Sequence, residues 1–287
     1  MARLRRTVLF VPANSGKMIG KASALGADMV ILDCEDSVPQ QEKGNARATF
    51  GPEMRKYDWG RKEVGVRVNG LDTPFFDEDL KAAVEAGAKF VVLPKIESAS
   101  EIVQIQGKIE KFGRGNRLPE IMVTIENPKG LNNVEQILAA SPLITSMEFG
   151  SEDFALSLGI YGVERSGQST LYARSRIVAS GHAAGVDVLD QAFVGLADPE
   201  GLRASALDAR NLGFTGKAVI HPSQIDVVNS VFTPSKEEVG WAKRVLEAWK
   251  SAQAEGRGAF RLDDKMVDVV HVKMAESIVS KAESLGL

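Results

Sequence analysis

The stretch Met29-Val-Ile-Leu-Asp-Cys-Glu-Asp36 contains the pattern that decides the fold. Four consecutive apolar residues predict a buried strand, and acidic residues follow directly. The preceding segment, Lys17–Leu25, has apolar residues at helical spacing, and Gly26 after it suits the left-handed turn that stops a helix. The stretch therefore predicts a helix, then a buried strand, then a polar strand end.

This unit recurs along the chain. Short apolar runs that predict strands are found at Thr7–Val11, Met29–Leu32, Val64–Val68, Phe90–Leu93, Ile121–Ile125, Ile144–Phe149, Val186–Leu189 and Ala218–Ile220. Segments with the 3.6-residue period that predicts helices are Lys17–Leu25, Phe76–Ala86, Ser98–Phe112, Gly130–Ala140, Tyr172–Ala184 and Pro199–Asn211. Glycines at Gly26, Gly87, Gly185 and Gly213 are expected to end four of the helices.

Apolar strands that alternate with amphipathic helices indicate a parallel sheet covered by helices. Eight such units are typical of a (β/α)₈ TIM barrel, whereas an open doubly wound sheet more often has five to seven strands. The pattern favours an α/β chain with a barrel over residues 1–232. Residues 233–287 form a C-terminal extension, with a helix at Thr233–Gly256, a break at Gly256-Arg-Gly258 and a last helical segment at Leu262–Leu287.

Composition excludes several classes of function. The net charge of −3 gives no basic field for nucleic acid or an anionic membrane. No stretch approaches the roughly 20 apolar residues that span a bilayer, and Thr7–Val11 is too short for a signal-peptide core. The lone cysteine, Cys34, has no partner for an intramolecular disulfide, as is usual in a reducing compartment. We expect a cytoplasmic protein.

Active sites of TIM barrels lie where the strands end, and Arg67 follows such a strand. An arginine among valines requires an anion to meet its charge. One interpretation is a structural ion pair with Asp33 or Glu35. The other is a planar fork that binds a substrate carboxylate or thioester oxygen.

Glu126 and Asp153 follow two neighbouring predicted strands, so their side chains are expected in one pocket. Two oxygen ligands with no nearby histidine or cysteine suit Mg²⁺, which keeps waters and takes substrate oxygens at its other positions. The alternative is that each carboxylate only caps the helix that follows it.

Other polar residues near the strand ends allow narrower interpretations. Lys17 and Lys21 lie at a helix start beside the barrel mouth and are candidates for binding phosphate groups. Lys95 is either a Schiff-base nucleophile or, as we favour, a cation at the rim. Cys34 lies between two acidic residues, which disfavours a thiolate.

Taken in order, these strand-end residues resemble the citrate lyase β-subunit/malyl-CoA lyase group of the HpcH/HpaI aldolase superfamily. The matching pieces are Leu9-Phe-Val-Pro12, Gly26-Ala-Asp28, Leu32-Asp-Cys-Glu-Asp-Ser-Val38, Arg67-Val-Asn69, Leu93-Pro-Lys95, Ile125-Glu126, Gly150 with Asp153-Phe154, Tyr172-Ala-Arg174, Gly213-Phe-Thr-Gly-Lys217 and Lys265-Met-Val-Asp268. They cover nearly the whole chain. Asn127-Pro128 and Cys34 depart from the residues common at those positions.

The resemblance implies a TIM barrel that holds Mg²⁺ with Glu126 and Asp153, and in which Arg67 contacts substrate. It also implies that the C-terminal segment closes over a neighbouring subunit's active site and supplies Asp268 as an acid, with a trimer favoured. Asp33 and Glu35 then orient Arg67 and metal-bound water.

The implied reaction makes or breaks a carbon–carbon bond in a β-hydroxyacyl-CoA such as malyl-CoA or citramalyl-CoA, with a small keto acid as the second product. The alternatives are the citryl-acyl-carrier-protein lyase subunit of a citrate lyase complex, a thioesterase of the malyl-CoA type, and a barrel that serves as a non-catalytic partner subunit.

Overall fold

The computed structural model describes residues 3–113, 117–160 and 167–287. The chain divides into two compact units, which are considered separately here. One unit is formed by Arg5–Asn229, and the other contains Ser230–Leu287. Within the described residues, no helix combines the length and the apolar character needed to cross a membrane.

The larger unit is a closed barrel of eight strands in which β8 pairs with β1. All pairings in the barrel are parallel. The strands are β1 (Thr7–Pro12), β2 (Met29–Asp33), β3 (Glu63–Arg67), β4 (Phe90–Leu93), β5 (Glu120–Ile125), β6 (Ile144–Phe149), β7 (Asp187–Asp190) and β8 (Gly216–Val219). The predicted (β/α)₈ barrel is confirmed, and the open sheet is wrong.

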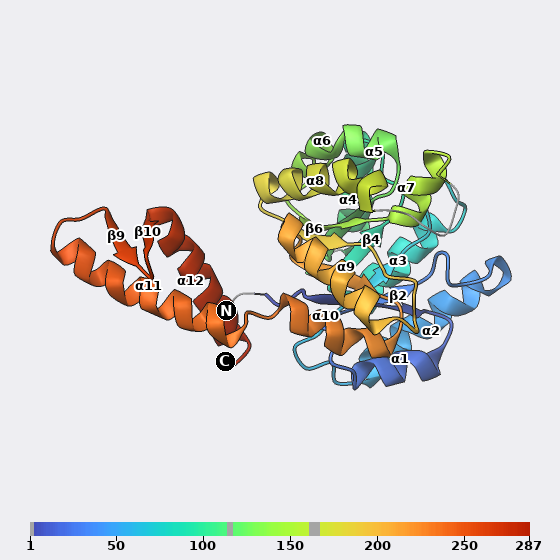
Figure 1. The fold of residues 1–287 in the computed structure, drawn as a ribbon. Helices are drawn as coiled ribbons and strands as arrows, with labels where there is room; N and C mark the ends of the chain where they lie inside the picture. The colour runs from blue at the N-terminus through green and yellow to red at the C-terminus, as the bar shows by residue number, and fades with distance from the viewer. Residues whose placement is uncertain (1–2, 114–116, 161–166) are drawn as a thin grey trace. The chain divides into compact units, whose positions relative to one another are not determined.

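Helices surround the barrel (Figure 1). They are α1 (Gly16–Ser23), α2 (Lys43–Lys56), α3 (Phe76–Ala86), α4 (Ala99–Gly113), α5 (Pro128–Asn132), α6 (Val134–Ala139), α7 (Ser151–Ser157), α8 (Gly167–Ala184), α9 (Pro199–Leu212) and α10 (Ile225–Phe232). The sequence patterns missed α2, α7 and α10. The single helix expected over Gly130–Ala140 is wrong, because Asn133 separates α5 from α6.

Three of the four predicted helix-ending glycines have the left-handed backbone. Gly87 and Gly213 have φ values of 78° and 104° as the C-caps of α3 and α9, and Gly185 has a φ of 71°. The expectation for Gly26 is wrong: α1 ends at Ser23, and its C-cap, Ala24, has an ordinary right-handed backbone.

The barrel interior is apolar in its middle and charged at both ends. Val8, Met29, Ile31, Phe90, Val92, Met122 and Leu189 form one buried cluster. The strand register then decides which polar residues meet above it. Asp33 pairs with Arg67 across β2 and β3, so both side chains stand at the same level of the barrel.

The other end of the barrel is closed by Arg5, which is 3% exposed. Its guanidinium forms ion pairs of 2.7, 2.9 and 3.3 Å with Glu63, Glu120 and Asp187. These three acids begin β3, β5 and β7. The arginine therefore ties together the starts of alternate strands, far from the strand ends at which barrel enzymes bind substrate.

A second buried ion network links the sheet to its helices. Lys217 on β8 is fully buried, and its Nζ lies 2.6 Å from Asp190 Oδ2 at the end of β7. Arg174 on α8 donates to Asp190 Oδ1 at 3.1 Å and to Asp208 on α9 at 2.5 Å. Burial lowers the pKa of Lys217. Two of the sequence motifs, around Arg174 and Lys217, are thus explained by one structural network.

The smaller unit is a helix pair with a hairpin between its helices. It contains α11 (Lys236–Ala254), β9 (Ala259–Leu262), β10 (Lys265–Asp268) and α12 (Val269–Ser284). The two strands are antiparallel, and Phe260 and Val267 join the apolar core between the helices. The expectation of continuous helix from Leu262 onward is therefore wrong. The break predicted at Gly256-Arg-Gly258 does separate α11 from the hairpin.

Candidate active site

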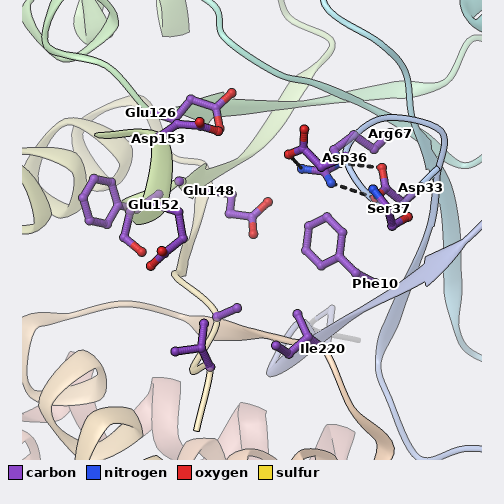
Figure 2. Close-up of a pocket in the computed structure, with 15 residues that line it drawn as sticks. Phe10, Asp33, Asp36, Ser37, Arg67, Glu126, Glu148, Glu152, Asp153 and Ile220 are labelled. Atoms are coloured by element: carbon purple, nitrogen blue, oxygen red, sulfur yellow. Dashed lines mark hydrogen bonds and ion pairs between the residues drawn. The ribbon is translucent and has the colours of Figure 1, made fainter. Parts of the chain in front are cut away.

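A pocket of about 380 Å³ opens at the carboxyl ends of the barrel strands (Figure 2). Acidic residues dominate its polar lining, and apolar residues form another part of the wall. The lining residues are Phe10, Asp33, Asp36, Ser37, Arg67, Glu126, Glu148, Phe149, Gly150, Ser151, Glu152, Asp153, Ala192, Val194 and Ile220. The strand-end residues singled out from the sequence thus include much of this lining.

Glu126 and Asp153 lie side by side in the pocket (Figure 2). Glu126 directly follows β5 and is 4% exposed, and Asp153 is half-buried in the first turn of α7. Burial raises the pKa of Glu126 to about 8, and the negative charges of Glu35 and Asp153 act in the same direction. The site is therefore one in which a cation would stabilise the ionised carboxylates.

Neither carboxylate caps a helix, which removes the alternative interpretation of this pair. The N-cap of α5 is Asn127, whose side chain accepts from the N–H of Gly130 at 2.8 Å. The N-cap of α7 is Gly150, and no side chain caps that helix. Both acidic groups remain available to the pocket.

The backbone on both sides of Glu126 is adapted to it. The N–H of Lys95 donates to Glu126 Oε1 at 2.6 Å, and Lys95 has a φ of 56°, which is unusual for a residue with a side chain. On the other side, a Cβ added to Gly150 would lie 2.5 Å from the Cβ of Glu126. A strained backbone, such as that of Lys95, is found most often at functional sites.

Arg67 forms a two-pronged ion pair with Asp33. Its Nε and Nη2 donate to the two carboxylate oxygens of Asp33, each at 2.7 Å. Its Nη1 lies 3.1 Å from Glu35 Oε2, and the Arg67 side chain is 14% exposed. Asp33 is buried, but the guanidinium lowers its pKa. The ion pair that the sequence left as one interpretation is present, and Arg67 also faces the pocket.

Lys95 has the character of a rim cation. Its Nζ lies 3.0 Å from Glu35 Oε1, and its side chain is 48% exposed. Glu35 holds the pKa of Lys95 above its ordinary value against the effect of partial burial. A Schiff-base lysine must be a neutral amine, so this setting disfavours that role.

Glu148 was missed by the sequence analysis and lies inside the pocket between Arg67 and the Glu126/Asp153 pair (Figure 2). It is 6% exposed, and burial raises its pKa to about 7 against the opposing effect of Arg67. The only sequence signal was a charged residue inside the apolar run Ile144–Phe149. That signal becomes informative once the barrel shows that Glu148 faces inward.

Three further residues considered in the sequence analysis, Lys17, Lys21 and Cys34, belong to the barrel unit but do not line this pocket. Lys17 and Lys21 are exposed on α1, which follows β1. Cys34 is buried, and burial raises the pKa of its thiol well above the ordinary value, which agrees with its dismissal as a nucleophile. Asp268 belongs to the smaller unit, where it ends β10 and caps α12. There its Oδ1 lies 2.8 Å from His271 Nδ1, and this contact lowers the pKa of Asp268.

The donor set fits a hard divalent cation. Among the described residues, no cluster of three or more histidine, cysteine, aspartate or glutamate side chains is arranged to hold a metal. Two carboxylates alone suit Mg²⁺, which commonly binds through one or two protein carboxylates and fills its other positions with water and substrate oxygens. Glu126 and Asp153 are the pair that would hold it.

Comparisons with known proteins identify the family of this chain. The family model for HpcH/HpaI aldolase/citrate lyase matches residues 6–222. The chain is 35% identical to the citrate lyase subunit beta of Leuconostoc mesenteroides, over 98% of this chain and 94% of that protein. It is also 35% identical to the L-malyl-CoA/beta-methylmalyl-CoA lyase of Rhodobacter capsulatus, over 98% and 96%.

Solved structures extend the likeness to the fold. The CitE protein of Mycobacterium tuberculosis, in complex with magnesium, acetoacetate and coenzyme A, is 32% identical with a TM-score of 0.80. The match covers 98% of each chain. The chain belongs to the HpcH/HpaI aldolase/citrate lyase family.

Proposed function

We propose that this protein is a Mg²⁺-dependent carbon–carbon lyase that cleaves a β-hydroxyacyl-CoA into a keto acid and an acyl-CoA, or condenses the two. One observation carries the proposal: the Glu126/Asp153 pair and the guanidinium of Arg67 line the same pocket at the barrel mouth (Figure 2). The names of the relatives, which are lyases of malyl-CoA and citrate, support the same chemistry.

In the cleavage direction, the β-hydroxyl group loses a proton and becomes the carbonyl of the keto acid. The Cα–Cβ bond breaks, and its electron pair moves into the thioester as an enolate. A proton added to the α-carbon completes the acyl product. When bound, Mg²⁺ would supply positive charge that stabilises the keto-acid oxygens. Glu126 and Asp153 would hold the ion.

Arg67 would stabilise the negative charge that develops on the thioester oxygen. Its orientation is preorganised, because Asp33 fixes two of its nitrogens and Glu35 lies near the third. A donor held in place before the reaction does not have to reorganise as charge develops, so it contributes more than a mobile one. Glu126 would also contact the substrate at its keto-acid end.

Asp268 would be the group that exchanges a proton with the α-carbon, and we propose that it acts in a neighbouring subunit. Exposed apolar residues lie close to it in the chain: Met266, Val269, Val270 and Met274. An exposed apolar set around a polar group is typical of a docking surface. We therefore infer a homo-oligomer, with a trimer favoured, in which residues 233–287 serve as a lid.

Lys17 and Lys21 would meet the phosphate groups of coenzyme A or the phosphopantetheine of a carrier protein. Lys17 is exposed in the first turn of α1, where the helix dipole and the free backbone N–H groups favour anions. The expectation that Lys21 lies at the helix start is wrong, because Lys21 is in the last turn of α1, and there it would contribute only the charge of its exposed side chain. We infer a cytoplasmic enzyme, because a single free cysteine, Cys34, is usual in a reducing compartment.

A product assay tests the proposal. Purified protein with Mg²⁺ is incubated with malyl-, methylmalyl-, citramalyl- and citryl-CoA and with a citryl thioester of an acyl-carrier protein, and products are identified by mass spectrometry. A keto acid with an acyl-CoA supports the lyase. Free coenzyme A with an intact hydroxy acid indicates a thioesterase, and turnover only of a carrier-protein thioester indicates a citrate lyase subunit. No turnover of any substrate would contradict the proposal.

A further inference from the structure

The polar surface around the Glu126/Asp153 pair is acidic on both sides. The barrel-mouth pocket contains six acidic residues and one cation: Asp33, Asp36, Glu126, Glu148, Glu152, Asp153 and Arg67. A neighbouring hollow, also of about 380 Å³, contains five acidic residues and one cation: Asp72, Glu97, Glu101, Glu126, Asp153 and Lys95. The two hollows meet at Glu126 and Asp153.

Both cations already have acidic partners. Arg67 holds Asp33 with two hydrogen bonds of 2.7 Å and lies near Glu35. The Nζ of Lys95 lies 3.0 Å from Glu35. Among the described residues that line the two hollows, no other lysine or arginine is present to meet a further anion.

The excess of acidic side chains in these hollows distinguishes between two kinds of keto acid that a lyase of this family could release. The keto acid formed from a malyl or citramalyl thioester has one carboxylate, whose charge a Mg²⁺ ion held by Glu126 and Asp153 would neutralise. The keto acid formed from a citryl thioester has a second carboxylate on a CH₂ group. An unpaired anion in a partly buried, acidic pocket is strongly unfavourable.

The negative charge of Glu148 disfavours that second carboxylate in the pocket. It lies between Arg67 and the Glu126/Asp153 pair (Figure 2). Within the described part of the chain, no hydrogen bond or ion pair to its carboxylate is found, although it is 6% exposed. Of the buried acids in this pocket, it is the one that neither belongs to the proposed metal pair nor supports Arg67.

The apolar part of the wall fits a small uncharged group instead. Phe10, Val194 and Ile220 line the pocket, and Phe10 and Ile220 lie across it from the Glu126/Asp153 pair (Figure 2). These side chains can contact a hydrogen atom or a methyl group on the keto carbon. They offer no donor to a carboxylate.

We infer that this site selects keto acids with a single carboxylate, and that Glu148 is the residue that excludes a second one. The inference rests on the proposed lyase function and narrows its substrate class. Overall identity cannot make this distinction, because the chain is 35% identical both to a citrate lyase subunit and to a malyl-CoA lyase.

The experiment compares two pairs of ligands, and in each pair only one member carries the second carboxylate. For turnover, the pair is citramalyl-CoA and citryl-CoA, which carry CH₃ and CH₂COO⁻ at the same carbon. For binding with Mg²⁺, the pair is 2-oxobutyrate and freshly dissolved oxaloacetate, measured by titration calorimetry with the decarboxylation of oxaloacetate followed in parallel. Wild-type protein is expected to favour the monocarboxylic member of each pair by at least about tenfold, which is about 1.4 kcal/mol.

Variants then test the role of Glu148. Both comparisons are made at about pH 8, where Glu148, with a pKa of about 7, is mostly ionised. Glu148→Gln keeps the size of the side chain and removes this charge, so turnover and binding of the dicarboxylic ligand should rise toward those of the monocarboxylic one. Glu152→Gln is the matched control, because Glu152 lines the same pocket but is exposed and screened by solvent. Equal effects of the two substitutions would contradict the role of Glu148.

The outcomes separate this inference from the proposed function. Wild-type protein that cleaves citryl-CoA as well as citramalyl-CoA, or binds both keto acids equally, would overturn the inference and leave the lyase intact. This measurement needs no variant, so it decides the question even if Glu148→Gln does not fold. Failure to cleave any thioester would instead remove the proposed function.

Discussion

Gly150 and Glu126 are in such close contact that residue 150 cannot carry a side chain without moving the glutamate. A Cβ on Gly150 would lie 2.5 Å from Glu126 Cβ and 2.6 Å from Glu126 Oε2. The φ of Gly150 is −87°, which any residue can adopt. The requirement for glycine here is therefore one of space beside the carboxylate, and it does not arise from backbone conformation.

Gly150→Ala is expected to weaken Mg²⁺ binding by about tenfold or more, because Glu126 must leave its position beside Asp153. Titration with Mn²⁺, followed by electron paramagnetic resonance, measures the affinity directly. Gly107→Ala on α4 is the control, since a Cβ there meets nothing within 4 Å. Unchanged Mn²⁺ affinity in Gly150→Ala would show that Glu126 does not need this position to bind metal.

Metal binding should release a proton at neutral pH. In the metal-free protein the pKa of Glu126 is about 8, so its carboxyl is mostly protonated below that pH, and Mg²⁺ must displace the proton. Affinity should rise about tenfold per pH unit below about pH 8 and then level off. Calorimetry in buffers of different ionisation enthalpy reports the proton count, which Glu126→Gln should abolish together with most of the binding.

The same shift predicts how the stability of the metal-free protein depends on pH. The pKa of Glu126 is raised from 4.5 to about 8 in the folded state, so the folded protein binds more protons than the unfolded chain between these values. Stability should therefore fall as pH rises from about 4.5 to about 8, and Mg²⁺ should reverse this trend. Thermal unfolding midpoints across this range, with and without metal, check the sign.

Arg67→Lys is expected to lower kcat/KM by roughly a hundredfold, since an ammonium group cannot hold both oxygens of Asp33 and also face the substrate. Steady-state kinetics with the substrate found in the product assay measures the loss. Mg²⁺ affinity should change little, which separates this effect from damage to the metal pair. Turnover and KM equal to those of the wild type would mean that Arg67 serves only as a structural ion pair.

The proposed shared site makes a prediction for mixed oligomers. Truncation after Arg257 should leave a folded, metal-binding barrel with little lyase activity. Glu126→Ala and Asp268→Ala proteins should each be inactive, but a mixture that exchanges subunits should recover part of the activity, because some sites combine an intact pair with an intact tail. Subunit exchange is verified by native mass spectrometry. No recovery despite exchange would show that the tail does not act in a neighbour.

Lys217→Met should destabilise the fold without acting in the pocket. It removes a buried ammonium 2.6 Å from Asp190 and leaves that carboxylate with Arg174 alone. Breaking a buried pair costs roughly 3 kcal/mol, which corresponds to about 5–10 °C in the unfolding midpoint. Lys243→Met, at an exposed position on α11, is the matched control. Equal midpoints would show that the pair adds no net stability.

Local patterns in the sequence were sufficient to predict the barrel and some of the residues of its candidate site. The run Met29–Leu32 followed by Asp33 already indicates a buried strand with a polar end, because burial and strand formation are dictated by neighbouring residues. The same reasoning placed Glu126 and Asp153 just after two adjacent strands. It failed for the hairpin Ala259–Asp268, whose strands have four residues each and whose turn uses Asp263 and Asp264 with positive φ in place of glycine.

The sequence by itself therefore determined the order of the eight barrel strands, several of the helices between them and the polar residues at the strand ends. The tertiary structure alone decided which of these residues meet. The register of β2 and β3 in the closed barrel places Asp33 beside Arg67. The side chain of Glu148, which in the sequence is only a charged residue within the run Ile144–Phe149, points into the barrel from β6 and lines the pocket. Such contacts depend on strands distant in sequence, and a side-chain period of two reveals alternation but not which face is interior.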